Sequence, residues 1–157
     1  MASTSTSSST DRIEKQIEIA APRARVWRAL TDVKEFNAWF GVRLEGVFKA
    51  GARVKGQITI KGYEHVTMDV IVERVEPESL FSWRWSPYAV DPKVDYSKEE
   101  RTLVEFRLTE TKGRTLLKVV ESGFDKVPAG RRDEAFRMNS GGWEGQLENL
   151  ARHAAAK

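Results

Sequence analysis

The first candidate for a chemical role in this sequence is Glu121, a carboxylate at a position where a buried side chain is expected. The segment 114–122 alternates in polarity, and Glu121 has the same parity as the apolar Leu117 and Val119, which predicts that all three face inward. A buried carboxylate needs a partner or takes a raised pKa. Its predicted partner is Arg137 or a donor group of a ligand, and the alternative is a strand-end position wetted by solvent.

Two other polar residues occupy positions of interest. Asn139 falls on the inward-facing stripe of the predicted C-terminal helix, and His65 begins a predicted strand. His65 either lines a pocket or lies in an exposed loop. One group with a shifted pKa is enough for general acid–base catalysis, so Glu121 or His65 would serve in a small cyclase or hydrolase. No residue is assigned a catalytic role, and a protein without enzymatic activity is favoured.

Other kinds of chemistry lack the residues that they require. The sequence contains no cysteine, which excludes disulfides, thiolate metal sites and cysteine catalysis. Its two histidines, His65 and His153, have no carboxylates at a metal-ligand spacing. Nucleophile elbows, phosphate loops and dinucleotide fingerprints are also missing. We therefore expect no bound metal and no cofactor.

Charge and hydropathy exclude further classes of protein. The 26 basic and 23 acidic residues are interleaved, with a net charge of +3, whereas a nucleic-acid surface needs clustered Lys and Arg. No apolar run reaches the length of about 18 residues that a membrane span needs. Residues 1–11 are rich in Ser and Thr and lack the apolar core of a signal peptide. We therefore expect a disordered tail and a cytoplasmic location.

Periodicity predicts the elements that would position these side chains. Apolar residues recur with helical spacing in 21–32 and 33–40, with Asp32 as the N-cap of the second helix, and a long helix is expected from about Arg131. Alternating segments predict strands at 12–20, 42–48, 52–61, 65–75, 80–85, 101–110 and 114–122. Because short turns join most of them, the sheet is antiparallel. The expected single α+β domain covers residues 12–157, with the sheet wrapped around the long helix.

Aromatic residues concentrate on the predicted inward faces. Phe81, Trp83 and Trp85 alternate along one strand, and Trp143 lies on the stripe of the long helix. They form either a packed core or the wall of a ligand cavity that holds a few polar groups. The predicted ligand-contacting residues are Trp39, Phe40, His65, Phe81, Trp83, Trp85, Phe106, Glu121, Phe124, Asn139, Trp143 and Leu147.

The segment 86–100 is long and polar and contains two prolines. Segments of this length without strands or helices are usually functional lids or disordered. It is either a mobile lid that carries Tyr88 and Tyr96 over the cavity or a plain disordered loop.

Three glycines surround Trp143 in the predicted long helix: Gly141, Gly142 and Gly145. Each glycine in a helix interior costs roughly 0.5–1 kcal/mol relative to alanine, so their presence needs a reason. Either the helix bends here, or another backbone packs closely against this face. That backbone would come from segment 123–130 or from a second subunit, and the second case implies a homodimer.

Four motifs carry a family resemblance: APRARVWRALTD, TLVEFRLTE, ESGFD and GGWEGQLENL. Over about residues 12–154 the chain resembles the domain named for the activator of the heat-shock-protein-90 ATPase. That domain belongs to the SRPBCC superfamily, with START lipid-transfer domains, the birch-pollen allergen and polyketide cyclases. The resemblance implies a helix-grip (START-like) fold, in which a curved antiparallel sheet grips the C-terminal helix around a cavity.

These observations rank three functions. The first is non-enzymatic binding of a small hydrophobic or amphipathic ligand in an aromatic-lined cavity between the sheet and the C-terminal helix. The alternative, implied by the resemblance, is a co-chaperone-like module of the stress response that stimulates the ATPase of a heat-shock chaperone. The third is a small cyclase or hydrolase with an acid–base residue in the cavity.

Overall fold

The structure is a computed structural model that describes residues 10–156. The expected disordered tail therefore lies, for residues 1–9, outside the described residues. The elements are β1 Arg12–Ile19, α1 Arg23–Thr31, α2 Val33–Phe40, β2 Val42–Glu45, β3 Arg53–Ile58, β4 Thr67–Glu76, β5 Leu80–Trp85, β6 Thr102–Thr111, β7 Arg114–Ser122 and α3 Ala129–Ala156. Two short 3-10 turns lie at Tyr96–Lys98 and Phe124–Lys126. This is the predicted order of elements.

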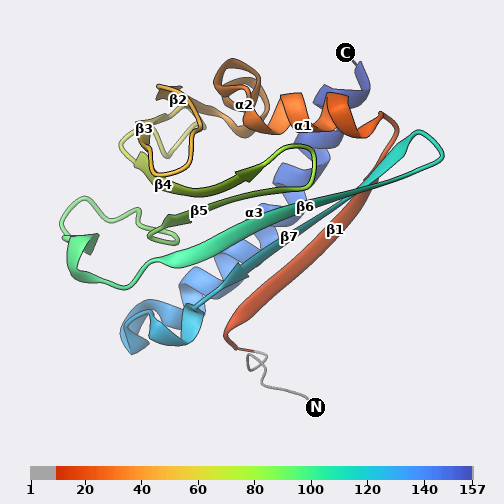
Figure 1. Cartoon of the computed structure of the whole chain (residues 1–157). Helices are drawn as coiled ribbons and strands as arrows, with labels where there is room; N and C mark the ends of the chain where they lie inside the picture. Colours follow the sequence, from red (N-terminus) through yellow and green to blue (C-terminus); the bar gives the residue numbers. More distant parts are fainter. Residues whose placement is uncertain (1–9, 157) are drawn as a thin grey trace.

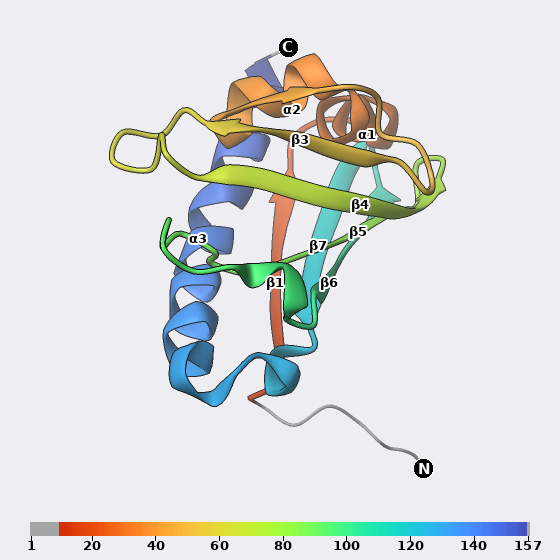
Figure 2. The same cartoon turned by 90° about the vertical axis from the view of Figure 1, so that its left-hand side faces the viewer.

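The strands form one seven-stranded antiparallel sheet in the order β1-β7-β6-β5-β4-β3-β2. Strands β2 to β7 follow one another in the sheet, with the long segment 86–101 between β5 and β6, and β1 completes the sheet by pairing with β7. The sheet curves around α3, while α1 and α2 lie at one end of it, close to the C-terminus (Figures 1 and 2). The predicted α+β fold is confirmed.

The predicted inward faces of the long hairpin are also confirmed. All of these positions are buried: Thr102, Val104, Phe106, Leu108, Thr115, Leu117, Val119 and Glu121. The register pairs Val104 with Glu121 and Phe106 with Val119, so side chains of the same parity lie side by side on the concave face. Burying this face against α3 supplies the main favourable free energy of the fold.

Local signals determine where α2 begins and ends. The Asp32 carboxylate accepts a hydrogen bond from the Glu35 main-chain N–H at 3.1 Å, which is the predicted N-cap. Gly41 ends the helix with a φ of 88° and donates its N–H to the Asn37 carbonyl. An added Cβ at Gly41 would lie 2.7 Å from the Ile60 side chain. This close approach therefore requires glycine.

Helix α3 is continuous through the three glycines around Trp143, without an irregular turn. Among the described residues, a Cβ added at Gly141, Gly142 or Gly145 would meet nothing within 4 Å. The prediction that segment 123–130 packs closely on this face is therefore wrong. A second subunit on this face stays a prediction. Gly142, on this open face of α3, also lines a pocket.

Candidate functional site

The aromatic side chains at the centre of the sheet form a packed core. Trp83, Phe81 and Phe106 are fully buried, and the ring centroid of Trp83 lies 5.6 Å from that of Phe81 and 5.2 Å from that of Phe106. Trp143 joins them from α3, 5.6 Å from Phe106. No described residue accepts a hydrogen bond from the buried Trp83 indole N–H. Close packing of this kind is typical of a protein core.

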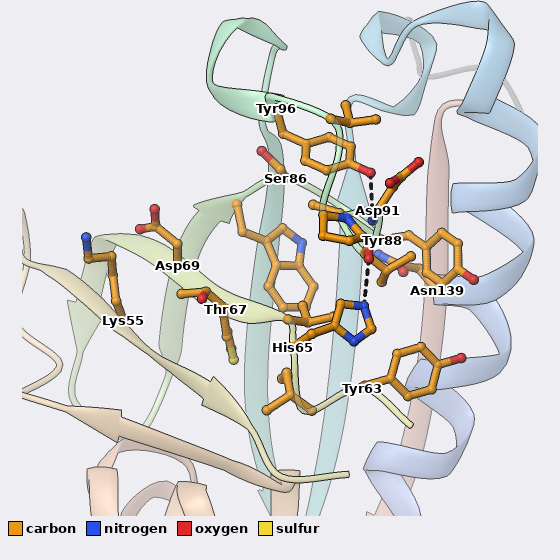
Figure 3. Close-up of a pocket in the computed structure, with 18 of the residues that line it drawn as sticks. Lys55, Tyr63, His65, Thr67, Asp69, Ser86, Tyr88, Asp91, Tyr96 and Asn139 are labelled. Atoms are coloured by element: carbon orange, nitrogen blue, oxygen red, sulfur yellow. Dashed lines mark hydrogen bonds between the residues drawn. The ribbon is translucent and has the colours of Figure 1, made fainter. Parts of the chain in front are cut away.

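An open pocket of about 640 Å³ lies beside this core. It is bounded by the first residues of β4, by β3, by the segment 86–101 and by α3 (Figure 3). Its apolar and aromatic lining comprises Phe40, Ile58, Ile60, Tyr63, Val66, Met68, Trp85, Tyr88, Ala89, Val90, Pro92, Val94, Tyr96 and Met138. Its polar lining includes Arg53, Lys55, His65, Thr67, Asp69, Asp91, Arg101 and Asn139.

The pocket reaches both faces of the sheet around the start of β4. Met68 is buried on the concave side, whereas its neighbours Thr67 and Asp69 point to the opposite face. All three line the pocket. We call its concave part, with Phe40, Ile58, Met68, Trp85, Met138 and Asn139, the inner lobe. The part on the other face, with Arg53, Lys55, Thr67, Asp69 and Arg101, is the outer lobe.

The segment 86–101 covers the pocket and is tied to both of its sides. Arg131 of α3 donates to the Pro87 carbonyl at 2.8 Å, pairs with Glu99 at 2.6 Å and lies over the Tyr96 ring at 4.7 Å. On the opposite wall, the His65 Nε2 lies 2.9 Å from the Val90 carbonyl oxygen (Figure 3). The segment therefore has a defined conformation over the cavity, and its movement as a lid stays a prediction.

Glu121 lies directly behind the pocket wall and is fully buried. Its Oε1 accepts hydrogen bonds from the Trp143 indole at 2.8 Å and from the Asn139 amide at 3.0 Å. Its Oε2 accepts from the Thr102 hydroxyl at 2.6 Å and from the Trp85 indole at 2.7 Å. Every one of these donors is a neutral side chain.

The predicted pair with Arg137 and the alternative of a solvent-wetted strand end are therefore wrong, whereas a contact with a ligand donor stays a prediction. Neutral donors take the place predicted for Arg137, and the side chain is not wetted at a strand end, because its exposed fraction is 0%. Burial raises the pKa of Glu121 above its ordinary value, and its four hydrogen bonds oppose part of that rise. Two of the donors, Trp85 and Asn139, line the pocket. Glu121 thus holds one indole and one amide of the wall in fixed orientations.

The predicted ligand-contacting residues divide into two groups. Phe40, His65, Trp85 and Asn139 line the pocket. The others are buried in the core or directly behind the wall, namely Trp39, Phe81, Trp83, Phe106, Glu121, Phe124, Trp143 and Leu147. Ligand contact by any residue of either group stays a prediction.

Sequence reasoning missed Tyr63, Lys55, Arg101 and Met138 as lining residues. Tyr63 lies in a turn before β4, where polarity has no period that would show the direction of a side chain. Burial raises the pKa of the Tyr88 hydroxyl, and a hydrogen bond with Tyr63 adds to that rise. Among these missed residues, only Met138 could have been predicted from the sequence, because it is the direct neighbour of Asn139 in the helix.

Within residues 10–156, no three His, Asp or Glu side chains are grouped so that they could hold a metal ion. None of the helices in this range is long and apolar enough to cross a membrane.

A curved antiparallel sheet that grips a C-terminal helix, with a pocket between them, defines the helix-grip class of α+β proteins. Within that class, residues 20–155 match the family model described as activator of Hsp90 ATPase homolog 1-like protein. The chain belongs to this family. No curated protein sequence matches it significantly.

Solved structures of similar fold agree with this assignment. DynU16, a protein from the dynemicin biosynthetic locus, is 26% identical over 91% of this chain with a TM-score of 0.70, and this chain covers 46% of DynU16. MLL2253 from Mesorhizobium loti is 27% identical with a TM-score of 0.71, over 90% of this chain and 95% of its own. The Aha1 dimer from Colwellia psychrerythraea is 17% identical with a TM-score of 0.68, over 92% and 96%. This last likeness concerns the fold alone.

Proposed function

We propose that this protein binds a small amphipathic ligand in the pocket beneath the segment 86–101 and has no catalytic role. The observation that carries the proposal is the pocket itself. Its volume of about 640 Å³ lies within the range of roughly 300–1,000 Å³ found for small-molecule sites. Its wall is largely apolar and aromatic, with a few polar groups, which is the composition of such sites.

Asn139 gives the inner lobe its polar recognition group. Its amide nitrogen donates to Glu121, and since a carboxylate there needs a donor, the orientation of the amide is fixed. No described residue donates to the Oδ1 of Asn139 in return. This oxygen is therefore the acceptor that a hydroxyl or N–H group of a ligand would meet.

Hydrogen bonding favours binding over acid–base catalysis. A carboxylate has about four lone-pair sites, and in Glu121 all of them are used by Thr102, Trp85, Trp143 and Asn139. The group also lies behind the wall and does not line the pocket. A general base needs a free lone pair within hydrogen-bonding reach of its substrate, which this arrangement does not offer.

Family membership supports a second candidate, a co-chaperone-like module. Such a module needs an interaction surface on the sheet, and the outer face offers mainly charged residues that pair with each other. Examples are the pairs Lys118–Glu14 at 3.0 Å and Arg114–Glu18 at 3.4 Å. Exposed pairs of this kind contribute little energy. We therefore rank stimulation of a chaperone ATPase second.

The proposal is tested with the neutral fluorescent probe N-phenyl-1-naphthylamine. We expect saturable binding that Gly142→Phe weakens at least fivefold, because a side chain at Gly142 would project into the mouth of the pocket. Gly145→Phe is the matched control, since it lies on the same open helix face but does not line the pocket. Absence of binding, or equal effects of both variants, would contradict the proposal and make chaperone ATPase stimulation the next assay.

A further inference from the structure

We infer that the ligand is an amphipathic anion, with its negative head group in the outer lobe and its apolar body in the inner lobe. This inference rests on the proposed function, because it specifies the chemistry of the molecule that the same pocket takes. It follows from the distribution of charge along the pocket.

The outer lobe holds more positive than negative charge. Its charged residues are Arg53, Lys55 and Arg101 against the single carboxylate of Asp69. The other acidic lining residue, Asp91, lies at the opposite end of the pocket from Lys55 (Figure 3). An anion is therefore favoured at one end of the cavity and disfavoured at the other.

Asp69 is already committed to one of these cations. Arg53 binds it with two hydrogen bonds, from Nε to Oδ1 at 2.9 Å and from Nη2 to Oδ2 at 2.7 Å. These bonds are the main reason that the pKa of Asp69 lies below its usual range. Arg101 donates to the Asp69 carbonyl oxygen at 3.1 Å, and its Nη2 stays 3.7 Å from the carboxylate. The bidentate pair with Arg53 is the strongest of these contacts, and the charges of Arg101 and Lys55 lower the pKa of the same carboxyl group further.

Lys55 is the cation left for a ligand. It faces Asp69 in the register of β3 and β4, yet among the described residues no ion pair involves Lys55. Its side chain is exposed at the edge of the outer lobe. The flexible side chain of Lys55 carries an ammonium group with three donors, which can reach an anion bound beside Arg101.

The inner lobe fits the apolar part of the same molecule. Phe40, Ile58 and Met68 form its floor with the ring of Trp85. Behind Trp85 lies the carboxyl group of Glu121, and none of the described residues of this lobe is a Lys or Arg that could pair with a negative head group. The ligand would therefore extend past the start of β4, with its apolar body in the inner lobe and its charged group in the outer lobe.

The test displaces N-phenyl-1-naphthylamine with three competitors of equal chain length: decanoate, decan-1-ol and decylammonium, at pH 7.5. We expect decanoate to compete at least tenfold more strongly than decan-1-ol, and decylammonium to be the weakest. Raising the salt concentration should weaken decanoate alone, because an exposed charge contact is screened.

Two variants assign the effect to the outer lobe. Lys55→Gln should weaken decanoate at least fivefold and change decan-1-ol less than twofold. Lys49→Gln, at an exposed lysine outside the pocket, should change neither. If decan-1-ol competes as well as decanoate, or if Lys55→Gln has no selective effect, this inference fails while the proposed function stands. If the probe does not bind at all, both fail.

Discussion

The two indole N–H groups that meet Glu121 can only donate, so both carboxylate oxygens must accept. Thr102 is more adaptable, because its hydroxyl lies 2.6 Å from Oε2 and 3.4 Å from the Trp85 carbonyl oxygen. If Oε2 takes up a proton, it can donate to Thr102 while the hydroxyl donates to that carbonyl. The network therefore tolerates the neutral carboxyl group that burial favours.

An amide at this position has no such freedom. In Glu121→Gln, the NH₂ group would face the indole of either Trp85 or Trp143, and two donors cannot pair. We expect a loss of about 1–3 kcal/mol in the free energy of unfolding, measured by urea denaturation at neutral pH. The control Glu148→Gln, at an exposed carboxylate, should change stability by less than about 0.5 kcal/mol. Equal stability of the two variants would contradict this account of Glu121.

At the scale of elements, Glu35 joins the three helices at one end of the sheet. From α2 it accepts hydrogen bonds from Arg25 of α1 at 2.6 Å and Arg28 of α1 at 3.1 Å, and it lies 2.9 Å from the Nε2 of His153 in α3. Burial raises the pKa of this carboxyl group, but the hydrogen bonds outweigh burial and lower it from 4.5 to about 2. The ionised form is therefore the one that the fold stabilises.

A lowered carboxyl pKa contributes stability above the unfolded value of 4.5, and this contribution is lost as pH falls towards about 2. Glu35→Gln should therefore reduce the free energy of unfolding at pH 7 by roughly 1–2 kcal/mol. The difference from the wild type should shrink between pH 4.5 and pH 2, as measured by denaturant titrations across this range. A difference that stays constant with pH would be inconsistent with this assignment.

The glycine face of α3 gives another prediction at this scale. Because Gly141 and Gly145 are helical, exposed and open to added side chains, neither needs to be glycine for the fold of the monomer. Replacing each with alanine should raise the free energy of unfolding by about 0.5–1 kcal/mol. Thermal unfolding measures the change. Loss of stability would indicate a close neighbour on this face, such as a second subunit.

At the scale of the whole molecule, periodicity predicted the sheet and the long helix because each has one buried face. Parity alone also predicted that Glu121 faces inward. Its partners were not predictable, since Trp85 and Thr102 come together only through the register of β5 with β6. Only part of the pocket wall was predicted, for a different reason. The wall comes largely from the segments 59–66 and 86–101, where the sequence has no period that shows which side chains face inward.

The most direct test of the account is an NMR titration of the protein with N-phenyl-1-naphthylamine. The Trp85 indole and the Asn139 amide line the pocket, so their N–H resonances should shift in a saturable manner. The Trp39 indole is an internal control, because it does not line the pocket and its N–H is buried and donates to the Ala29 carbonyl. Its resonance should not move. Shifts confined to the outer face of β1 and β7, or no shifts at all, would contradict the claim that this pocket binds ligands.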